Sequence, residues 1–348
     1  MTDLGLIDGI MTRLLSLIIL VTMTAQMAFA KISFSTELLN SANQGKVEAQ
    51  YDLALCYYYG YGCNVDYESA FKWFDGSAKK GYYPAIYALS ICYEKGHGCI
   101  RNQELAFSLC KLAAEKGMNM AKNRLGILYE KGIGCEKNVD EAFKWYNMAA
   151  QGGDAEAQYN VAFFYKNGIG CAANADSAFF WYEKSAVQGV ADAQFNLAQC
   201  YRKGFGCGRC PNSAFYWFEK SAAQGLADAQ FNLSLCYKDG YGCVKSLDSA
   251  FMWVKKSAEQ GYMLAQYNLA LCYVWGVGCQ KDPKEALGWY LKAANQGYAD
   301  AQYNLALCYR NGFGCSVDLE SSFFWLNKAA SQGHEDAKQL LTQMKKVE

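Results

Sequence analysis

The stretch from Ala301 to Asp336 reads AQYNLALCYRNGFGCSVDLESSFFWLNKAASQGHED, and its pattern occurs eight times, in phase, between Ala49 and Asp336. The period is 36 residues, and each copy opens with Ala, which is counted here as position 1. Tyr follows at position 9, and Cys at position 15 comes directly after the second of two glycines. A fixed period of this length is typical of a solenoid, in which one supersecondary unit stacks on its neighbours. It favours an extended binding surface over a catalytic cleft.

Each copy predicts two helices joined by a tight turn. Apolar residues at positions 1, 5, 8 and 9 recur at helical spacing, and Gly312 would end this first helix in a left-handed conformation. Asp318 then stands where a helix N-cap belongs, and Gly333 would end the second helix. The N-cap slot holds capping residue types in six other copies: Asp66, Asn102, Asn138, Asn174, Ser246 and Asp282. The sequence therefore predicts an all-α solenoid.

The expected organisation is a signal peptide (1–30), a capping helix (31–48), eight repeats and a second capping helix (337–348). The repeats are 49–84, 85–120, 121–156, 157–192, 193–228, 229–264, 265–300 and 301–336.

The N-terminus has the features of a secretion signal. Arg13 precedes the apolar run 14–21, and Ala28-Phe29-Ala30 supplies the small-x-small cleavage pattern. A transmembrane anchor is the alternative, but the run is shorter than the roughly 20 residues that a span needs. We expect cleavage after Ala30 and a secreted or periplasmic protein; a start at Met11 would give a more ordinary signal.

Composition argues against a nucleic-acid partner. The 33 basic and 33 acidic residues balance and form no basic tract. Aromatic residues make up 15% of the chain and sit at repeat positions, which favours packing. The Trp residues of the second helices are assigned to the core: Trp73, Trp145, Trp181, Trp217, Trp253, Trp289 and Trp325. We expect no cofactor, no metal, and a monomer.

Six copies carry a second Cys seven residues before the turn Cys: Cys56/Cys63, Cys92/Cys99, Cys200/Cys207, Cys236/Cys243, Cys272/Cys279 and Cys308/Cys315. On a continuous helix the two would lie roughly 10 Å apart, too far for a disulfide. The two glycines between them fold the chain back, so the thiols can meet. Each bridge would contribute about 2–3 kcal/mol in an oxidising compartment. Metal binding is the weaker alternative, because each pair is isolated and the chain has two histidines.

Four cysteines stay unmatched. Cys135 and Cys171 face Leu128 and Phe164 in place of a helix Cys. Cys110 takes a core position of a second helix, and Cys210 takes the N-cap slot. They are interpreted as buried thiols of diverged repeats or as partners for another thiol.

The pattern AQYNLALCYxxGxGCxxDxxxAxxWYxKAAxQGxxD closely resembles the Sel1-like repeat, a relative of the tetratricopeptide repeat. The cysteine pair is similar to that of the Helicobacter cysteine-rich proteins, and the resemblance covers residues 32–344. It implies a right-handed α/α superhelix with disulfide-bridged helix hairpins. It also implies a secreted or periplasmic module that binds peptides or proteins in host interaction or signalling. Some members are regarded as penicillin-binding proteins or β-lactamases.

The first helices line the concave face in stacks of this kind. Position 4 holds Asn in five consecutive copies: Asn160, Asn196, Asn232, Asn268 and Asn304. An amide offers donors and an acceptor, which suits a peptide backbone. Position 11 varies between copies and includes Trp275, a candidate aromatic contact. The alternative, hydrogen bonds within or between the helices, stays equally open.

Catalysis is the second hypothesis. An active-site-serine enzyme needs Ser-x-x-Lys with further motifs. Three segments match, beginning at Ser69, Ser77 and Ser108, but no Ser-Asp-Asn or Lys-Thr-Gly accompanies them. His97 and His334 are far apart in sequence, and His97, between two turn glycines, is expected to be exposed. We expect a binding module, with β-lactam or cell-wall-peptide hydrolysis as the alternative; redox sensing through the unmatched cysteines rests on their number alone.

Overall fold

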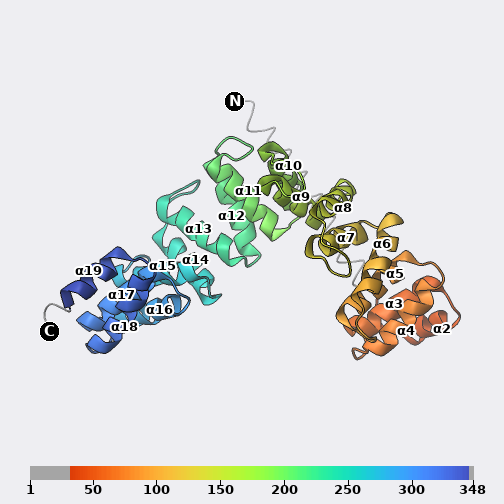
Figure 1. The fold of residues 1–348 in the computed structure, drawn as a ribbon, viewed down its shortest axis with the longest axis horizontal. Coiled ribbons are helices and arrows are strands. Elements are labelled where there is room, and N and C mark those ends of the chain that lie inside the picture. The colour runs from red at the N-terminus through yellow and green to blue at the C-terminus, as the bar shows by residue number, and fades with distance from the viewer. Residues whose placement is uncertain (1–31, 345–348) are drawn as a thin grey trace. The chain divides into compact units, whose positions relative to one another are not determined.

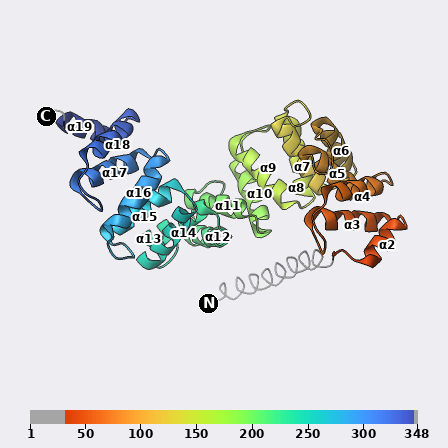
Figure 2. The same cartoon turned by 90° about the horizontal axis from the view of Figure 1, so that it is seen from below.

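The computed structural model describes residues 32–344, and within this range all regular structure is helical (Figures 1 and 2). The first helices of the repeats are α3 (Val47–Tyr59), α5 (Tyr83–Lys95), α7 (Asn119–Lys131), α9 (Ala155–Asn167), α11 (Ala191–Lys203), α13 (Ala227–Asp239), α15 (Met263–Trp275) and α17 (Ala299–Asn311). The second helices are α4 (Tyr67–Ala78), α6 (Gln103–Glu115), α8 (Val139–Gln151), α10 (Ala175–Val187), α12 (Pro211–Ala223), α14 (Leu247–Glu259), α16 (Pro283–Asn295) and α18 (Leu319–Ser331). The ends of this array carry α2 (Thr36–Asn43) and α19 (Glu335–Met344).

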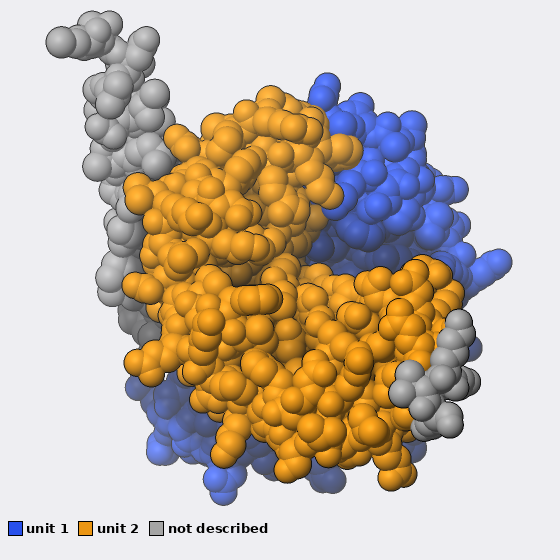
Figure 3. Space-filling model, turned by 90° about the vertical axis from the view of Figure 1, so that its left-hand side faces the viewer, with its two compact units in different colours: residues 1–184 blue, residues 185–348 orange. Residues whose placement is uncertain are grey.

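Each helix packs mainly against the helix before it and the helix after it. The chain divides into two compact units, residues 1–184 and 185–348, coloured separately in Figure 3. Within each unit the helices form antiparallel pairs that stack in sequence order, which confirms the predicted all-α solenoid. The predicted signal peptide, 1–30, lies outside the described residues.

The two turn signals act as the sequence predicts. Gly60 ends α3 in the left-handed conformation, with φ of 76°, and its N–H donates to the Cys56 carbonyl. Asp66 caps α4 by accepting a hydrogen bond of 3.0 Å from the Ser69 N–H. Each first helix begins two residues before position 1 of its repeat.

The core is built from small residues on the first helices and large ones on the second. Ala at position 1 and Leu or Val at position 5 are buried in nearly every copy. On the second helices the buried large residue is at position 26, for example Phe74 and Tyr146. The predicted Trp row occupies the position before it. Trp289 and Trp325 are buried, while the Trp residues of earlier copies pack against the edge of the core.

Neighbouring repeats contact each other through aromatic side chains and through backbone atoms at a turn glycine. Phe71 of repeat 1 packs edge-on against Tyr93 of repeat 2, with ring centroids 5.4 Å apart. The turn of repeat 2 approaches the start of α4 so closely that a Cβ on Gly98 would collide with the Tyr67 carbonyl. The second turn glycine is therefore needed for contact between repeats as well as for its φ of 72°.

A pair of glutamines links neighbouring repeats in the second unit. In repeat 7, the Gln266 side chain donates to the Ala258 carbonyl of repeat 6 over 3.3 Å. Gln296 donates to Gln266 over 2.8 Å and to the Gly261 carbonyl over 2.9 Å. We call the residues at positions 2 and 32 of repeats 5 to 8 the glutamine clamp: Gln194 and Gln224, Gln230 and Gln260, Gln266 and Gln296, and Gln302 and Gln332.

Candidate functional site

The asparagine row and the variable column lie on the first helices. Asn at position 4 is partly or fully buried, whereas position 11 is exposed in all eight repeats. Trp275, which ends α15, is 66% exposed. We call these two sets of residues the first-helix face: a recessed polar row beside a variable, solvent-exposed column.

Four of the five amides of the row donate hydrogen bonds within their own helices. Asn196 donates to the Asp192 carbonyl, Asn268 to that of Leu264 and Asn304 to that of Asp300, over 2.8–3.0 Å. The bond to the carbonyl four residues earlier is a usual use of a short polar side chain in a helix interior. One of the two interpretations left open by the sequence, hydrogen bonding within the helices, therefore holds in the structure.

Some members of the row also join neighbouring repeats. Asn160 donates to the Asn123 side chain over 3.0 Å, and Asn304 reaches the Tyr267 hydroxyl at 3.2 Å. Asn232, which is buried, accepts a hydrogen bond of 2.8 Å from Arg202.

In repeat 3 the same position holds Arg124, which forms an ion pair with Glu94 of repeat 2. Position 4 is thus where adjacent first helices contact each other through polar side chains.

The structure holds all sixteen cysteines as thiols and joins none of the six predicted pairs by a disulfide. This applies to Cys56 and Cys63, Cys92 and Cys99, Cys200 and Cys207, Cys236 and Cys243, Cys272 and Cys279, and Cys308 and Cys315. In the pair of repeat 5, for example, Cys200 is a buried thiol of α11 and Cys207 is a partly exposed thiol of the turn that follows. The six bridges, including the one from Cys200 to Cys207, therefore stay predictions.

The turn can form while both cysteines of a pair remain thiols. The turn Cys lies close to its partner's backbone: the Cys63 thiol is 3.4 Å from the Cys56 carbonyl oxygen, and the Cys243 thiol is 3.5 Å from that of Cys236. Cys135 makes the same contact with Leu128, at 3.6 Å, although that position lacks a thiol. The turn thus forms without a bridge, and its geometry is common to paired and unmatched copies.

The thiols differ in exposure and acidity. Burial raises the pKa of Cys92 and of Cys110 to about 12, so both thiols are protonated at neutral pH in the reduced chain. Burial also raises the pKa of Cys171. Cys210 differs, because a hydrogen bond from Ser213 lowers its pKa.

The three Ser-x-x-Lys serines take part in local backbone and capping contacts. Ser69 donates to its N-cap residue Asp66 over 2.6 Å. Ser77 donates to the Val47 carbonyl and Ser108 to the Glu104 carbonyl, both over 2.9 Å. Each hydroxyl thus has a structural acceptor.

His97 is not exposed as expected from its place between two glycines. Its ring stacks on Tyr67, with centroids 4.1 Å apart, and its Nδ1 lies 2.9 Å from the Tyr58 hydroxyl. Burial lowers its pKa below the ordinary value of 6.5. The turn of repeat 2 packs against repeat 1, and position 13 supplies the side chain for that contact.

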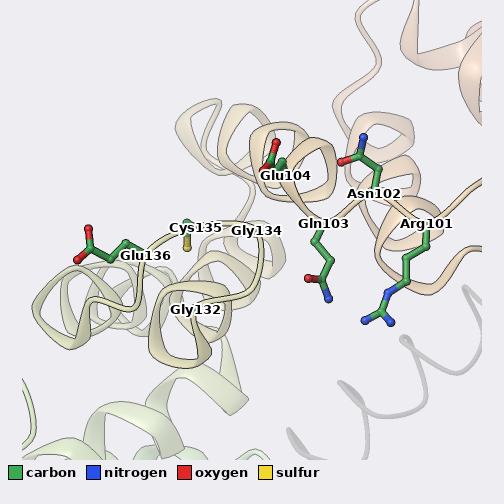
Figure 4. A pocket seen from close by; sticks show the side chains of 8 residues that line it. All are labelled: Arg101, Asn102, Gln103, Glu104, Gly132, Gly134, Cys135 and Glu136. Carbon is green, nitrogen blue, oxygen red and sulfur yellow. The ribbon is translucent and has the colours of Figure 1, made fainter.

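One depression in the described part of the chain is a polar notch between successive turns. It has a volume of about 820 Å³ and lies beside Cys135, between the start of α6 and the turn after α7 (Figure 4). Its side chains do not converge: Arg101 and Glu136 stand at opposite ends of the picture. An equivalent notch occurs one repeat earlier beside Cys99, which identifies it as a general product of the repeat geometry.

A second depression of about 460 Å³ is mainly apolar and lies in the first repeats. Tyr51, Tyr58 and Leu55 of α3 line it together with Tyr87 and Ile91 of α5. Sequence reasoning missed it, although one signal was visible: Ala88 interrupts the polar character of position 4.

Within residues 32–344, no group of three His, Cys, Asp or Glu side chains is arranged to hold a metal ion. Over the same range, none of the helices combines the length and the apolar character that a membrane crossing requires.

Comparison with known proteins identifies the repeat. The Sel1 repeat family model matches eight segments: 47–82, 84–118, 119–154, 155–190, 191–226, 227–262, 264–298 and 299–334. No curated protein sequence matches the chain.

Two solved structures share the fold at appreciable sequence identity. The protective antigen c5321 of uropathogenic Escherichia coli, described as displaying an SLR fold, is 33% identical over 88% of this chain, with a TM-score of 0.81. The match spans 66% of that antigen's length. A Sel1 repeat protein from Oxalobacter formigenes is 29% identical, with a TM-score of 0.65, over 91% of this chain and 92% of its own. With eight matched segments covering most of its length, the chain belongs to the Sel1 repeat family.

Proposed function

We propose that the protein is an exported scaffold that binds a peptide or protein segment along its first-helix face. Sel1-repeat scaffolds are in general protein-interaction modules. The observation that carries the proposal is the pairing of a recessed polar row at position 4 with an exposed, variable column at position 11. A constant row can grip features common to all peptides, while a variable column distinguishes between them.

The hydrogen bonds within the row leave it able to bind. Asn268 and Asn304 donate to their own helices through Nδ2, so the carbonyl oxygen of each amide keeps its two lone pairs for a ligand. The Asn232 oxygen instead accepts from Arg202 and Gln199. In Asn268 the described bond uses the Nδ2 donor, so the Oδ1 acceptor can receive a peptide N–H. The intrahelical bond fixes the rotamer, which lowers the entropic cost of binding.

The test is a triple variant, Asn196→Ala, Asn232→Ala and Asn268→Ala, compared with the wild-type protein in binding to an immobilised random-peptide display library. Loss of peptide recovery with unchanged helical circular dichroism is expected. Asn327→Ala is the matched control, because Asn327 makes the same bond to a carbonyl four residues earlier, but on the second helix α18. Equal recovery by the triple variant and the control would rule out the proposal.

We also propose that the mature chain begins at Lys31 and acquires six disulfides on export, one for each Cys pair seven residues apart. The separation of each pair across one turn, with the turn Cys against the backbone of its partner, supports this. Mass spectrometry of the exported, alkylated, unreduced protein tests it. An N-terminus at Lys31 with six bridges and four labelled thiols is expected. Sixteen labelled thiols on an uncleaved chain would contradict both export and bridging.

The alternative, hydrolysis of β-lactams or cell-wall peptides, gains no support from the three Ser-x-x-Lys segments. Their serines donate to a capping carboxylate or to backbone carbonyls, and no second catalytic motif accompanies them.

A further inference from the structure

The apolar depression in repeats 1 and 2 has a size and lining that fit a ligand. Its volume of about 460 Å³ falls within the range of roughly 300–1,000 Å³ that is usual for ligand pockets. The lining residues are Ile32, Tyr51, Leu55, Tyr58, Tyr59, Phe74, Tyr87, Ala88, Ile91, Lys95, Met118 and Met120. We call this depression the aromatic pocket.

The pocket exists because repeats 1 and 2 depart from the common pattern. At position 4 of repeat 8, Asn304 spans the gap to the preceding first helix and contacts the Tyr267 hydroxyl. Ala88 is the equivalent residue in repeat 2, and Tyr51 is the equivalent of Tyr267. Alanine has no amide to span the gap, so the space beside Tyr51 stays open.

A second departure makes the wall aromatic. Position 10 is Tyr58 in repeat 1, but it is charged in six of the other seven repeats, for example Glu94 and Arg202. Met118 and Met120 complete the opposite side. Methionine side chains adapt to different partners and contact aromatic rings favourably, which suits a binding surface.

The walls are held in place before any ligand arrives. Tyr51 packs against Phe74 and Tyr82, with ring centroids 5.7 and 5.4 Å apart. Tyr58 contacts Tyr67 at 5.2 Å, and its hydroxyl lies 2.9 Å from His97 Nδ1. A pocket with fixed walls binds without a large ordering cost.

The rim combines exposed apolar surface with one positive charge. Tyr59 and Met120 line the pocket and are 55% and 59% exposed, so a ligand can reach them. Lys95 is the charged residue among those that line the pocket, and it is exposed at the end of α5. Asp52 lines the adjacent depression instead. The pKa of its carboxyl group is raised, mainly by burial and less by the charge of Glu48.

We propose that the aromatic pocket takes a bulky apolar side chain of a bound peptide, with a neighbouring carboxylate of the peptide against the Lys95 ammonium. This deepens the proposed function and rests on it, because it supplies an anchor and a charge preference for a peptide bound at the first helices of repeats 1 and 2. A single desolvated aromatic anchor commonly dominates the affinity of such an interface. The carboxylate at the rim sets the sign of charge that is preferred.

The test uses two capped tripeptides, acetyl-Leu-Phe-Asp-amide and acetyl-Leu-Phe-Lys-amide, titrated into the full-length protein by calorimetry. The acidic tripeptide is expected to bind more tightly than the basic one. Ala88→Asn, which restores the residue type of the later repeats, should weaken the acidic tripeptide about tenfold or more by filling the pocket. Lys95→Gln should weaken it by about two- to fivefold, as expected for an exposed charge pair, and should not weaken the basic tripeptide, because a like-charge repulsion is removed.

Ala172→Asn is the control, because it makes the same chemical change in an exposed turn of repeat 4 that does not line the pocket. Equal affinity of Ala88→Asn and wild type for the acidic tripeptide, or no saturable binding by wild type, would overturn the proposal. Its failure is separable from that of the first-helix face. Library peptides that bind Ala88→Asn normally but are lost by the triple Asn variant would leave the face standing and remove the pocket.

Discussion

Repeats 5 to 8 and repeats 2 and 3 follow one 36-residue pattern, but different side-chain contacts join them to the adjacent repeats. In repeats 5 to 8 the position-2 glutamine of the clamp donates to a carbonyl at the end of the preceding repeat and so ties each first helix to that repeat. In repeats 2 and 3 position 2 is Ile86 and Lys122, which cannot make the same bonds. The size of the buried core clusters also differs between the two regions. One cluster extends from Phe231 to Leu341, whereas a small separate cluster is formed by residues between 86 and 128.

The difference shows that neighbouring helix pairs can be held together by a repeated set of buried hydrogen bonds or by contacts that are particular to one repeat. Repeats 2 and 3 use the second means: Arg124 pairs with Glu94, and Gly126 leaves room for the Tyr146 ring. The regular repeats supply a uniform face, and the diverged ones supply a distinct cavity.

The largest contrast is expected when the clamp is removed. Gln266 is 5% exposed, so Gln266→Ala opens a buried cavity and removes two hydrogen bonds at once, the one to the Ala258 carbonyl and the one from Gln296. A loss of about 2–3 kcal/mol in local stability is expected. Hydrogen exchange of the α15 amides, followed by mass spectrometry, measures it.

Lys122→Ala is the matched change in repeat 3, where the side chain bonds only to Asn119 of its own helix over 3.1 Å. It should alter exchange of the α7 amides little. Equal effects of the two substitutions would show that the clamp does not distinguish the two regions.

Smaller changes in the free energy of unfolding are expected at two helical glycines, where Ala should destabilise the protein at one position and stabilise it at the other. A Cβ on Gly126 would lie 2.6 Å from the Tyr146 ring, so Gly126→Ala should destabilise by about 1–3 kcal/mol. Gly288 in α16 has open space around its Cβ position, so Gly288→Ala should stabilise by up to about 1 kcal/mol through helix propensity. Urea denaturation followed by circular dichroism measures both. A stabilising Gly126→Ala would mean that Tyr146 is loosely held.

The smallest effect concerns pH. Burial lowers the pKa of His97 in the folded chain below the unfolded value of 6.5, so the unfolded chain binds the proton more readily. The stability that His97 contributes is therefore complete above pH 6.5 and declines as the pH falls through the folded pKa. Faster exchange in the turn of repeat 2 is expected at about pH 5, relative to pH 7 and corrected for intrinsic rates. His97→Ile, which copies the residue of repeats 3 and 4, should remove the pH dependence; its persistence would assign the effect to other groups.

The sequence was sufficient for the solenoid because its signals are local and repeated. Glycines such as Gly60 and caps such as Asp66 each act within a few residues, and eight copies make their spacing unmistakable. The glutamine clamp could have been found by the same means, since Gln recurs at positions 2 and 32.

The aromatic pocket and the environment of His97 could not be found in this way. The pocket depends on Ala88, which is informative only once its neighbour across the repeat boundary is known. His97 is packed because Tyr58 and Tyr67 of the preceding repeat meet it, and both lie 30 or more residues away in the chain. Departures from a repeat pattern look like drift until the structure shows which of them are adjacent.

The bare α-carbon at Gly98 has a consequence for how such a chain can change over generations. Because the backbone of one repeat rests directly on the backbone of the one before it, a single added methyl group would act as a wedge between two whole repeats. Substitution there would tilt everything that follows in that unit rather than disturb one side chain. The spacing between repeats thus depends on glycine being kept at this position. Duplication of a complete repeat would lengthen the chain and preserve that contact.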